Sequence, residues 1–350
     1  MRRTTVIRAG IVAILAGAAL ALLGAGCASG GGTTGDSASP SPAGSGLPAA
    51  GGSSAANVVQ AAPVRHVKVG DLSVGYRVIG PLAAATAGAS PAAAGEDTPL
   101  LLIMGFSGTM DLWSPAFVSA LAQDRQLIVF DNRGIGETGD PMNGYPFSQL
   151  ADDTAGLIKA LGYDSVDVLG WSMGGSVAID LTVRHAELVS RLVSYAGDAG
   201  GSLAVYPAPK VMAKLTDTSG SAQERGERLL ELLFTASYRS SHPDYWKEFP
   251  APTEMAAAKA VDLQGQAMGE WAGVWGDLKG ITCPTLFVTG AEDILTPPQN
   301  AVMMTVRVPG SWLQRFAGAG HGLMYQDPQG LAEAVLTFFS VTAAEGDASG

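Results

Sequence analysis

Cysteine and histidine are scarce in this chain. It has two cysteines, Cys27 and Cys283, and four histidines that lie far apart in the sequence. No group of these residues has the spacing of metal ligands, so the sequence argues against a metal site. Two cysteines allow one disulfide at most. We doubt this disulfide, because Cys27 has a better explanation at the end of an export signal.

Charged residues are also few, and most of them are acidic. They make up 15% of the 350 residues, and the formal net charge is −11. No stretch gathers lysine and arginine into a basic stripe. Because an acidic chain repels phosphate backbones, we expect no nucleic-acid partner. Apolar residues reach 47%, which is enough for the core of one large α/β domain or two small ones.

The N-terminus has the pattern of an export signal. Residues 1–8 are basic, and residues 9–26 are uncharged, largely apolar and end in small residues. The sequence LLGAGC resembles the lipobox of bacterial lipoproteins, with Gly24 at a position usually occupied by leucine. We therefore expect a signal peptide over 1–26 and a lipid anchor on Cys27, which holds the protein at the cell membrane. The alternatives are a retained signal anchor and plain secretion, and both also lead out of the cytoplasm.

Residues 27–62 are mainly Gly, Ser, Ala, Pro and Thr, with one acid. Such a segment buries too little apolar surface to offset the entropy lost on ordering. We expect a flexible linker here and a folded domain over 63–345.

Strands and helices alternate along the folded part. Residues 64–69 and 72–79 alternate in polarity around a turn, as a hairpin does. Continuous apolar runs, typical of strands buried on both faces, follow at 100–104, 127–130, 166–169, 192–195, 285–288 and 312–316. Helical stretches lie at 115–123, 148–162, 173–186, 298–308 and 328–340. This order predicts an α/β fold with a mostly parallel central sheet flanked by helices.

One connection is too long for a simple crossover. It runs from Tyr195 to Pro284 and contains helical stretches at 221–236 and 254–275. We expect an inserted helical lid over about 199–276.

The segment Gly170-Trp-Ser-Met-Gly174 matches G-x-S-x-G. The match alone is weak in a glycine-rich chain. Here, however, it stands between an apolar run and a helical stretch, as a nucleophile elbow requires. Ser172 is therefore the candidate nucleophile.

A serine hydroxyl needs a base and an acid that orients it. His321 follows the last apolar run in a glycine-rich loop, whereas the other histidines lie in the first hairpin, at a helix end and in the expected lid. The chain order Ser, acid, His favours Asp293, which follows the penultimate strand. Glu292 is its neighbour, and Asp198 is the second choice.

Two backbone N–H groups should form the oxyanion hole. Met173 directly follows the nucleophile, and Phe106 lies in the loop after the strand at 100–104. Another glycine-rich loop, at 131–139, lacks the spacing of a phosphate-binding loop, so we interpret it as a structural turn.

Four segments together resemble the α/β-hydrolase superfamily. They are GWSMGG at 170–175, DNRGIGET at 131–138, CPTLFVTGAED at 283–293 and GAGH at 318–321. The resemblance covers roughly residues 64–340 and implies the roles given above, no cofactor and usually a lid. Two positions depart from the common pattern: Met104 precedes Gly105 where many members have histidine, and Thr138 replaces the usual serine.

A serine nucleophile favours acyl transfer from esters, thioesters or amides. We expect a carboxylic-ester hydrolase that acts on a small apolar substrate. The same triad also serves peptidases, carbon–carbon hydrolases and cofactor-free haloperoxidases, and a non-catalytic ligand-binding lipoprotein is a further alternative. The fold alone does not choose among these.

Overall fold

The computed structural model describes residues 57–81, 98–123, 125–139, 143–217, 219–254 and 256–348. The expected signal peptide and Cys27 lie outside these residues. The end of the expected linker lies inside them and forms a short helix, α3 (Val58–Ala61). The Asn57 side chain caps this helix, and Val59 is fully buried in the core.

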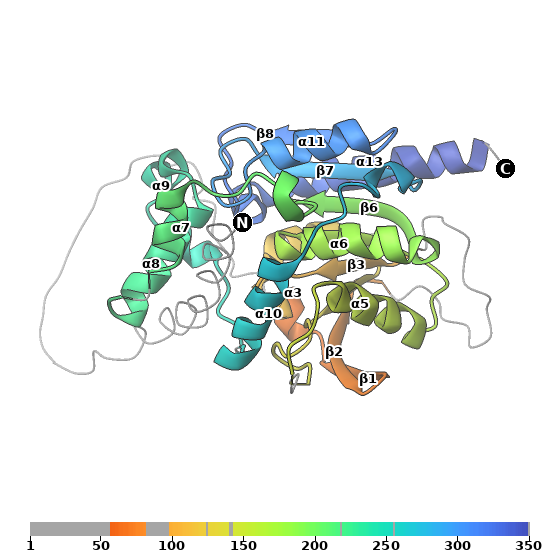
Figure 1. The fold of residues 1–350 in the computed structure, drawn as a ribbon, viewed down its shortest axis with the longest axis horizontal. Coiled ribbons are helices and arrows are strands. Elements are labelled where there is room, and N and C mark those ends of the chain that lie inside the picture. The colour runs from red at the N-terminus through yellow and green to blue at the C-terminus, as the bar shows by residue number, and fades with distance from the viewer. Residues whose placement is uncertain are drawn as a thin grey trace, which may run out of the picture.

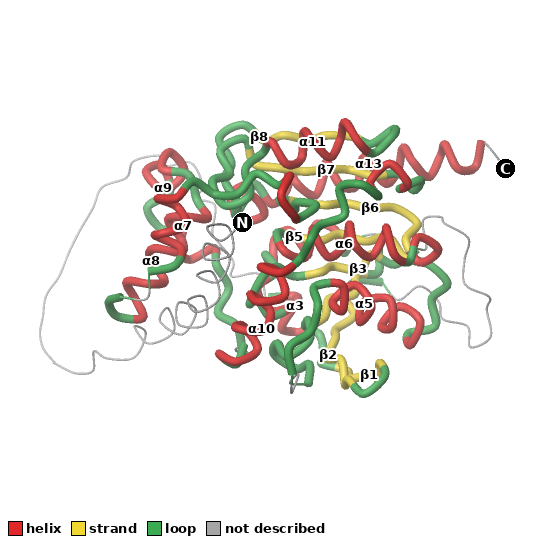
Figure 2. Tube along the Cα trace, in the orientation of Figure 1, coloured by secondary structure: helices red, strands yellow, loops and turns green. Residues whose placement is uncertain are grey.

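The centre of the molecule is an eight-stranded sheet with the order β1-β2-β4-β3-β5-β6-β7-β8 (Figures 1 and 2). Pairs β1/β2 and β2/β4 are antiparallel, and every other neighbouring pair is parallel. The predicted fold class is therefore confirmed. The strands are β1 Arg65–Val69, β2 Leu72–Ile79, β3 Leu100–Ile103, β4 Leu127–Phe130, β5 Val166–Trp171, β6 Val189–Tyr195, β7 Thr285–Gly290 and β8 Trp312–Phe316.

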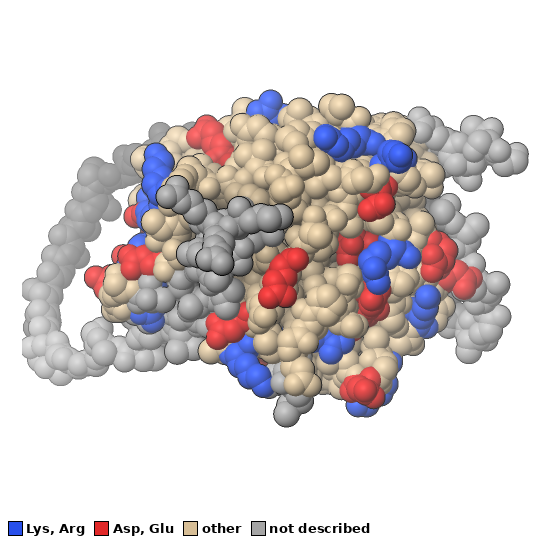
Figure 3. Space-filling model, in the orientation of Figure 1, with Lys and Arg blue, Asp and Glu red and all other residues tan. Residues whose placement is uncertain are grey.

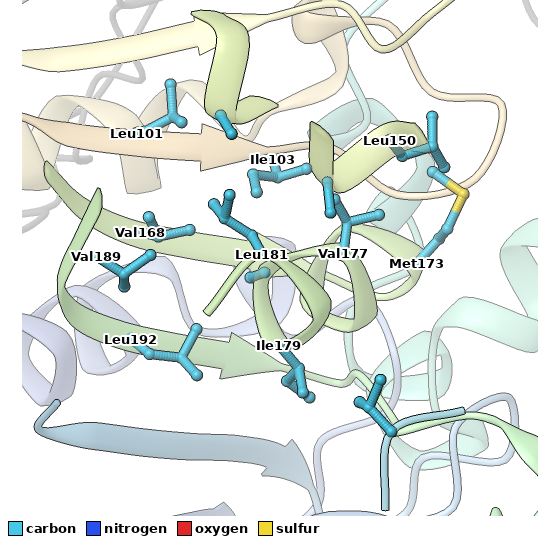
Figure 4. Packing of buried hydrophobic residues seen from close by; sticks show 14 of the residues in the cluster. Leu101, Ile103, Leu150, Val168, Met173, Val177, Ile179, Leu181, Val189 and Leu192 are labelled. Atoms are coloured by element: carbon cyan, nitrogen blue, oxygen red, sulfur yellow. The ribbon is translucent and has the colours of Figure 1, made fainter. Parts of the chain in front are cut away.

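Each face of the sheet carries its own apolar core. Successive strand residues point to opposite faces, so Leu101 and Ile103 lie in one cluster and Leu100 and Leu102 in the other. The first face packs against α5 (Ser148–Ala160), α6 (Met173–Arg184) and α11 (Gln299–Arg307), and the second against α4 (Pro115–Leu121), α12 (Leu323–Gln326) and α13 (Pro328–Ala348). Figure 4 shows side chains of α6 directed at β3, β5 and β6.

Four helices lie between β6 and β7, inside the 199–276 segment. They are α7 (Pro209–Leu215), α8 (Ala222–Leu233), α9 (Ala236–Ser241) and α10 (Ala258–Glu270). Helices α7, α8 and α9 gather to one side of the sheet, at the left of Figure 1. Short 3-10 turns complete the chain at Met110–Leu112, Ala186–Leu188, Gly201–Leu203, Tyr245–Glu248 and Leu278–Gly280.

Local signals explain where two of these helices begin and end. Ser221 and Glu224 form a capping box at the start of α8. Helix α10 is shorter than the predicted stretch, because the chain becomes extended at Trp271 and Gly273 has a positive φ of 82°.

On the face seen in Figure 3, acidic and basic side chains are interspersed and most of the surface is uncharged. None of the described helices is long and apolar enough to cross a bilayer.

Candidate active site

Ser172 stands at a sharp turn between β5 and α6. Its backbone has φ 58° and ψ −123°, a conformation that L residues seldom adopt. Glycines make the turn possible: a Cβ on Gly170 would lie 2.0 Å from the Gly174 carbonyl oxygen, and one on Gly174 would lie 2.0 Å from that of Ile103. The Ser172 amide donates to the Tyr195 carbonyl at 2.9 Å, which holds the elbow against β6.

The structure brings the three predicted residues Ser172, His321 and Asp293 together. His321 Nε2 lies 2.8 Å from Ser172 Oγ, and His321 Nδ1 lies 2.8 Å from Asp293 Oδ2. The other Asp293 oxygen accepts the Leu295 and Thr296 amides at 2.9 and 2.8 Å. With Asp293 ionised, Nδ1 carries the proton and Nε2 is left to accept one from the serine.

The competing residues lie elsewhere. Asp198 bonds the Gly200 amide rather than His321. His185 pairs with Asp152 at the end of α6, and His66 pairs with Glu137 in the first hairpin. His242 caps the end of α9.

Two aromatic residues that the sequence analysis did not single out hold the His321 backbone. Its carbonyl oxygen accepts the Tyr195 hydroxyl at 2.7 Å and the Trp171 indole N–H at 3.1 Å. Burial raises the pKa of Tyr195 well above its usual value, so the phenol stays neutral and donates. A tyrosine at the end of an apolar strand is the signal in the sequence, since the hydroxyl of a buried tyrosine needs a partner.

The two residues predicted to supply the oxyanion donors line the same pocket as Ser172. Met173 is the first residue of α6, and a helix leaves the amides of its first turn without intrahelical partners. Phe106 lies in the loop after β3, next to Gly105, whose backbone comes close to Ser172. The amide of the next residue, Ser107, is already occupied, because it donates to Gln264 Oε1 at 2.6 Å. Of these two neighbouring amides, that of Phe106 stays the predicted oxyanion donor.

Gln264 is a further residue that sequence reasoning missed. It comes from α10, is fully buried, and fixes the loop that carries Phe106. Its Nε2 has no hydrogen-bond partner within the part of the chain that the structure describes. A glutamine among the buried residues Ala260, Val261 and Ala267 of a helix is the signal that marks it.

A family model for the alpha/beta hydrolase fold matches residues 98–328. The chain belongs to this family. It is 28% identical over 243 residues to a poly(3-hydroxyalkanoate) depolymerase from Ectopseudomonas oleovorans, covering 69% of this chain and 84% of that protein. It is 29% identical over 262 residues to a 2-hydroxymuconate semialdehyde hydrolase from Pseudomonas putida, with 70% and 88% covered.

Solved structures show the same fold. A thermophilic esterase from Thermogutta terrifontis superposes with a TM-score of 0.65 at 21% identity, covering 81% of this chain and all of that one. At such identity the similarity concerns the fold, and the site of this hydrolase has to be interpreted from its own residues.

The pocket of this hydrolase has a volume of about 220 Å³ and opens onto Ser172 and His321. The 199–276 segment supplies much of its apolar wall: Val205, Tyr206, Pro207, Met212, Leu215, Leu229, Leu230, Leu233, Phe249 and Met268. Apart from the reacting residues, its polar lining consists of the carboxyl of Asp198 and the hydroxyl-bearing residues Ser107, Ser176, Tyr206 and Thr296. Apolar walls with a few placed polar groups are typical of small-molecule sites.

The glycine-rich loop at 131–139 supports the site from outside. Its Asp131 carboxylate accepts the Met110 and Glu137 amides at 2.6 and 2.9 Å, and burial raises its pKa to about 7. Thr138 donates to the Asp131 carbonyl and accepts the Gly75 amide, so it supplies the hydroxyl expected of the serine it replaces. Arg133 pairs with Asp153 of α5. Within the described ranges, no group of three His, Cys, Asp or Glu residues is placed to hold a metal.

Proposed function

We propose that this chain is a serine hydrolase that cleaves carboxylic esters through an acyl-enzyme. The observation that carries the proposal is the continuous hydrogen-bonded chain from Ser172 Oγ through His321 to Asp293, with 2.8 Å at each step. This is the arrangement in which a histidine activates a serine and a carboxylate orients the histidine.

The reaction proceeds in two halves. Ser172 Oγ attacks the ester carbonyl as its proton passes to His321 Nε2, and the oxyanion accepts hydrogen bonds from the Phe106 and Met173 amides. His321 then protonates the leaving alcohol and the C–O bond breaks. Water enters, gives a proton to His321 and attacks the acyl-enzyme, which releases the acid and restores Ser172.

The pocket supports an apolar substrate of small size. Its walls are mainly Leu, Met, Phe and Val side chains, and its volume of about 220 Å³ accommodates a small molecule. The relatives' names cover both a depolymerase and a semialdehyde hydrolase, so the reaction class needs its own test.

Labelling with a fluorophosphonate tests the nucleophile. We expect residues 28–350 to gain one adduct by intact mass and the Ser172→Ala variant to gain none. Ser176→Ala is the matched control, because Ser176 also lines the pocket and should leave labelling in place. An unlabelled but folded wild type would contradict the proposal and favour the non-catalytic binding protein.

A second test separates ester cleavage from other reactions of the same triad. We expect Ser172-dependent hydrolysis of p-nitrophenyl esters that depends on acyl-chain length. Labelled protein that hydrolyses no ester, yet cleaves a peptide or a carbon–carbon bond, would overturn the ester assignment alone.

We further propose that residues 1–26 direct export and that Cys27 carries a lipid. The basic start, the uncharged stretch and the small residues before Cys27 support this proposal. Expressed in a bacterium, the full chain should fractionate with membranes and incorporate labelled fatty acid, and Cys27→Ser should lose the label. Incorporation of labelled fatty acid into the Cys27→Ser variant would refute the proposed lipid anchor on Cys27.

A further inference from the structure

Asp198 lines the pocket, yet the mechanism gives it no part. Its Oδ1 accepts the Gly200 amide at 2.7 Å. Its Oδ2 receives no hydrogen bond from any described protein group. Burial raises the pKa of the Asp198 carboxyl, although the Gly200 amide lowers it. Asp198 is only partly buried, so this oxygen is open to the pocket, where a ligand can supply the donor.

Ser176 lies next to this carboxyl and has the complementary capacity. Its Oγ accepts the Asp198 amide at 3.1 Å, and it too lines the pocket. The Ser176 hydroxyl proton has no acceptor within the described residues. The pocket therefore presents a free acceptor and a free donor side by side. A hydroxyl group matches both, whereas an ammonium only donates and an ether or ketone only accepts.

The position of Asp198 and Ser176 indicates that they contact the acyl part of an ester substrate. The His321 carbonyl is held by Trp171 and Tyr195, whose side chains lie in the core of the α4/α13 face. His321 therefore lies toward that face, and in the proposal below the leaving group, which His321 protonates, lies on the same side. Ser176 instead belongs to α6, on the opposite face, one helical turn or roughly 6 Å beyond Ser172. An acyl chain directed away from His321 reaches Ser176 and Asp198.

We propose that Asp198 and Ser176 bind a hydroxyl group on the acyl chain, so that the hydrolase prefers hydroxyacyl esters. The hydroxyl donates to Asp198 Oδ2 and accepts from Ser176 Oγ. This inference rests on the proposed ester hydrolysis and adds the substrate class to it.

The test compares ethyl 3-hydroxybutanoate with ethyl 3-methoxybutanoate, and ethyl 5-hydroxyhexanoate with its 5-methoxy ether. The methoxy group keeps the oxygen but cannot donate. For at least one pair, we expect the wild type to show kcat/KM about tenfold or more in favour of the hydroxy ester, as for a hydrogen bond to a charged group. Equal kcat/KM within both pairs would overturn the proposal.

Variants distinguish recognition from a structural role. Asp198→Asn keeps an oxygen for the Gly200 amide but presents an NH₂ group, so the hydroxy-to-methoxy ratio should fall to within about twofold. Ser176→Ala should lower the ratio as well. Asp180→Asn, a buried carboxyl of α6 outside the pocket lining, is the control and should keep the wild-type ratio. If Asp198→Asn slows both esters equally, Asp198 only shapes the turn.

A binding measurement on an inactive variant distinguishes failure of this inference from failure of the proposed function. Ser172→Ala cannot form an acyl-enzyme, and calorimetry on this variant should still show tighter binding of the hydroxy ester. Loss of that preference in Ser172→Ala/Asp198→Asn supports the inference even if the wild type hydrolyses no ester. Hydrolysis without any preference in binding or turnover refutes the inference alone.

Discussion

Asp293 acts on the reaction only through the tautomer of His321. Both Asp293 oxygens accept hydrogen bonds, one from two backbone amides and the other from His321 Nδ1. An asparagine that keeps its oxygen on the backbone amides would turn its NH₂ group toward His321 Nδ1. The amide would then favour the imidazole tautomer with the proton on Nε2, which cannot accept the serine proton. We expect Asp293→Asn to lower kcat about 10³–10⁴-fold in an ester assay while KM changes little. If Asp198→Asn produced that loss and Asp293→Asn did not, the acid would be misassigned.

A second residue, Asp180, links stability to pH. It is buried on α6, its Oδ2 has no partner among the described groups, and burial raises its pKa to about 6 from 3.8. Between these two values the native state holds a proton that the unfolded chain has lost. The free energy of unfolding therefore falls as pH rises from about 4 to about 6 and stays lower above that.

Asp180→Asn should remove this dependence. Relative to the wild type, we expect the variant to gain about 2 kcal/mol more at pH 7.5 than at pH 4.5, measured by urea unfolding. Other carboxyls titrate in both proteins, and their contribution cancels in the difference. An equal difference at the two pH values would show that Asp180 has an ordinary pKa.

The reacting residues could be predicted from sequence because each stands in a local motif and follows a strand. Ser172 lies in a glycine elbow, and Asp293 and His321 follow the last two strands in the order of this fold. Tyr195 and Gln264 could not be predicted in the same way. Their partners, the His321 carbonyl and the Ser107 amide, are 126 and 157 residues away in the chain. Such contacts are set by tertiary structure.

At the scale of elements, α10 and the loop after β3 are coupled through Gln264. Replacing it with leucine would leave the partly buried Ser107 amide without an acceptor and release the loop that carries Phe106. Since a displacement of about 1 Å is costly in an active site, we expect Gln264→Leu to lower kcat roughly ten- to a hundredfold with a smaller change in KM.

Gln266→Leu is the matched control, because Gln266 lies on the same helix but is exposed and bonds Glu270. Its kcat should equal that of the wild type. A normal kcat in Gln264→Leu would mean that the loop keeps its shape without α10.

The elements themselves were predictable to different degrees. Strand β4 matches its predicted range, because a short apolar run between polar loops defines a strand buried in a sheet. Strand β8 also matches its range, but it is the edge strand and three of its five residues are exposed, so the expected burial on both faces was wrong there. Helices α7 and α9 were not predicted. They have seven and six residues, too few for a clear hydrophobic period, and helices this short depend on their caps and on packing.

At the scale of the whole molecule, the two ends of the parallel strands have different tasks. Ser172, Asp293 and His321 follow the carboxyl ends of β5, β7 and β8. The opposite end carries a buried ion cluster in which Asp167 bonds both Arg125 and Arg191. Arg191 also donates to the Phe339 carbonyl, and both guanidinium groups lie over the Phe339 ring. The cluster thus ties β5, β6 and the segment just before β4 to α13.

This separation predicts a variant that loses stability but keeps its chemistry. Asp167 is fully buried, and Asp167→Asn leaves two buried arginines without a counter-charge. We expect the free energy of unfolding to fall by about 3–5 kcal/mol. Asp152→Asn, which breaks a partly exposed pair with Arg184, should cost less than about 1 kcal/mol. Ser172 lies five residues along β5, roughly 17 Å away, so kcat of folded Asp167→Asn should match the wild type. A loss of kcat at temperatures where the variant is fully folded would show that the two ends of the sheet are coupled.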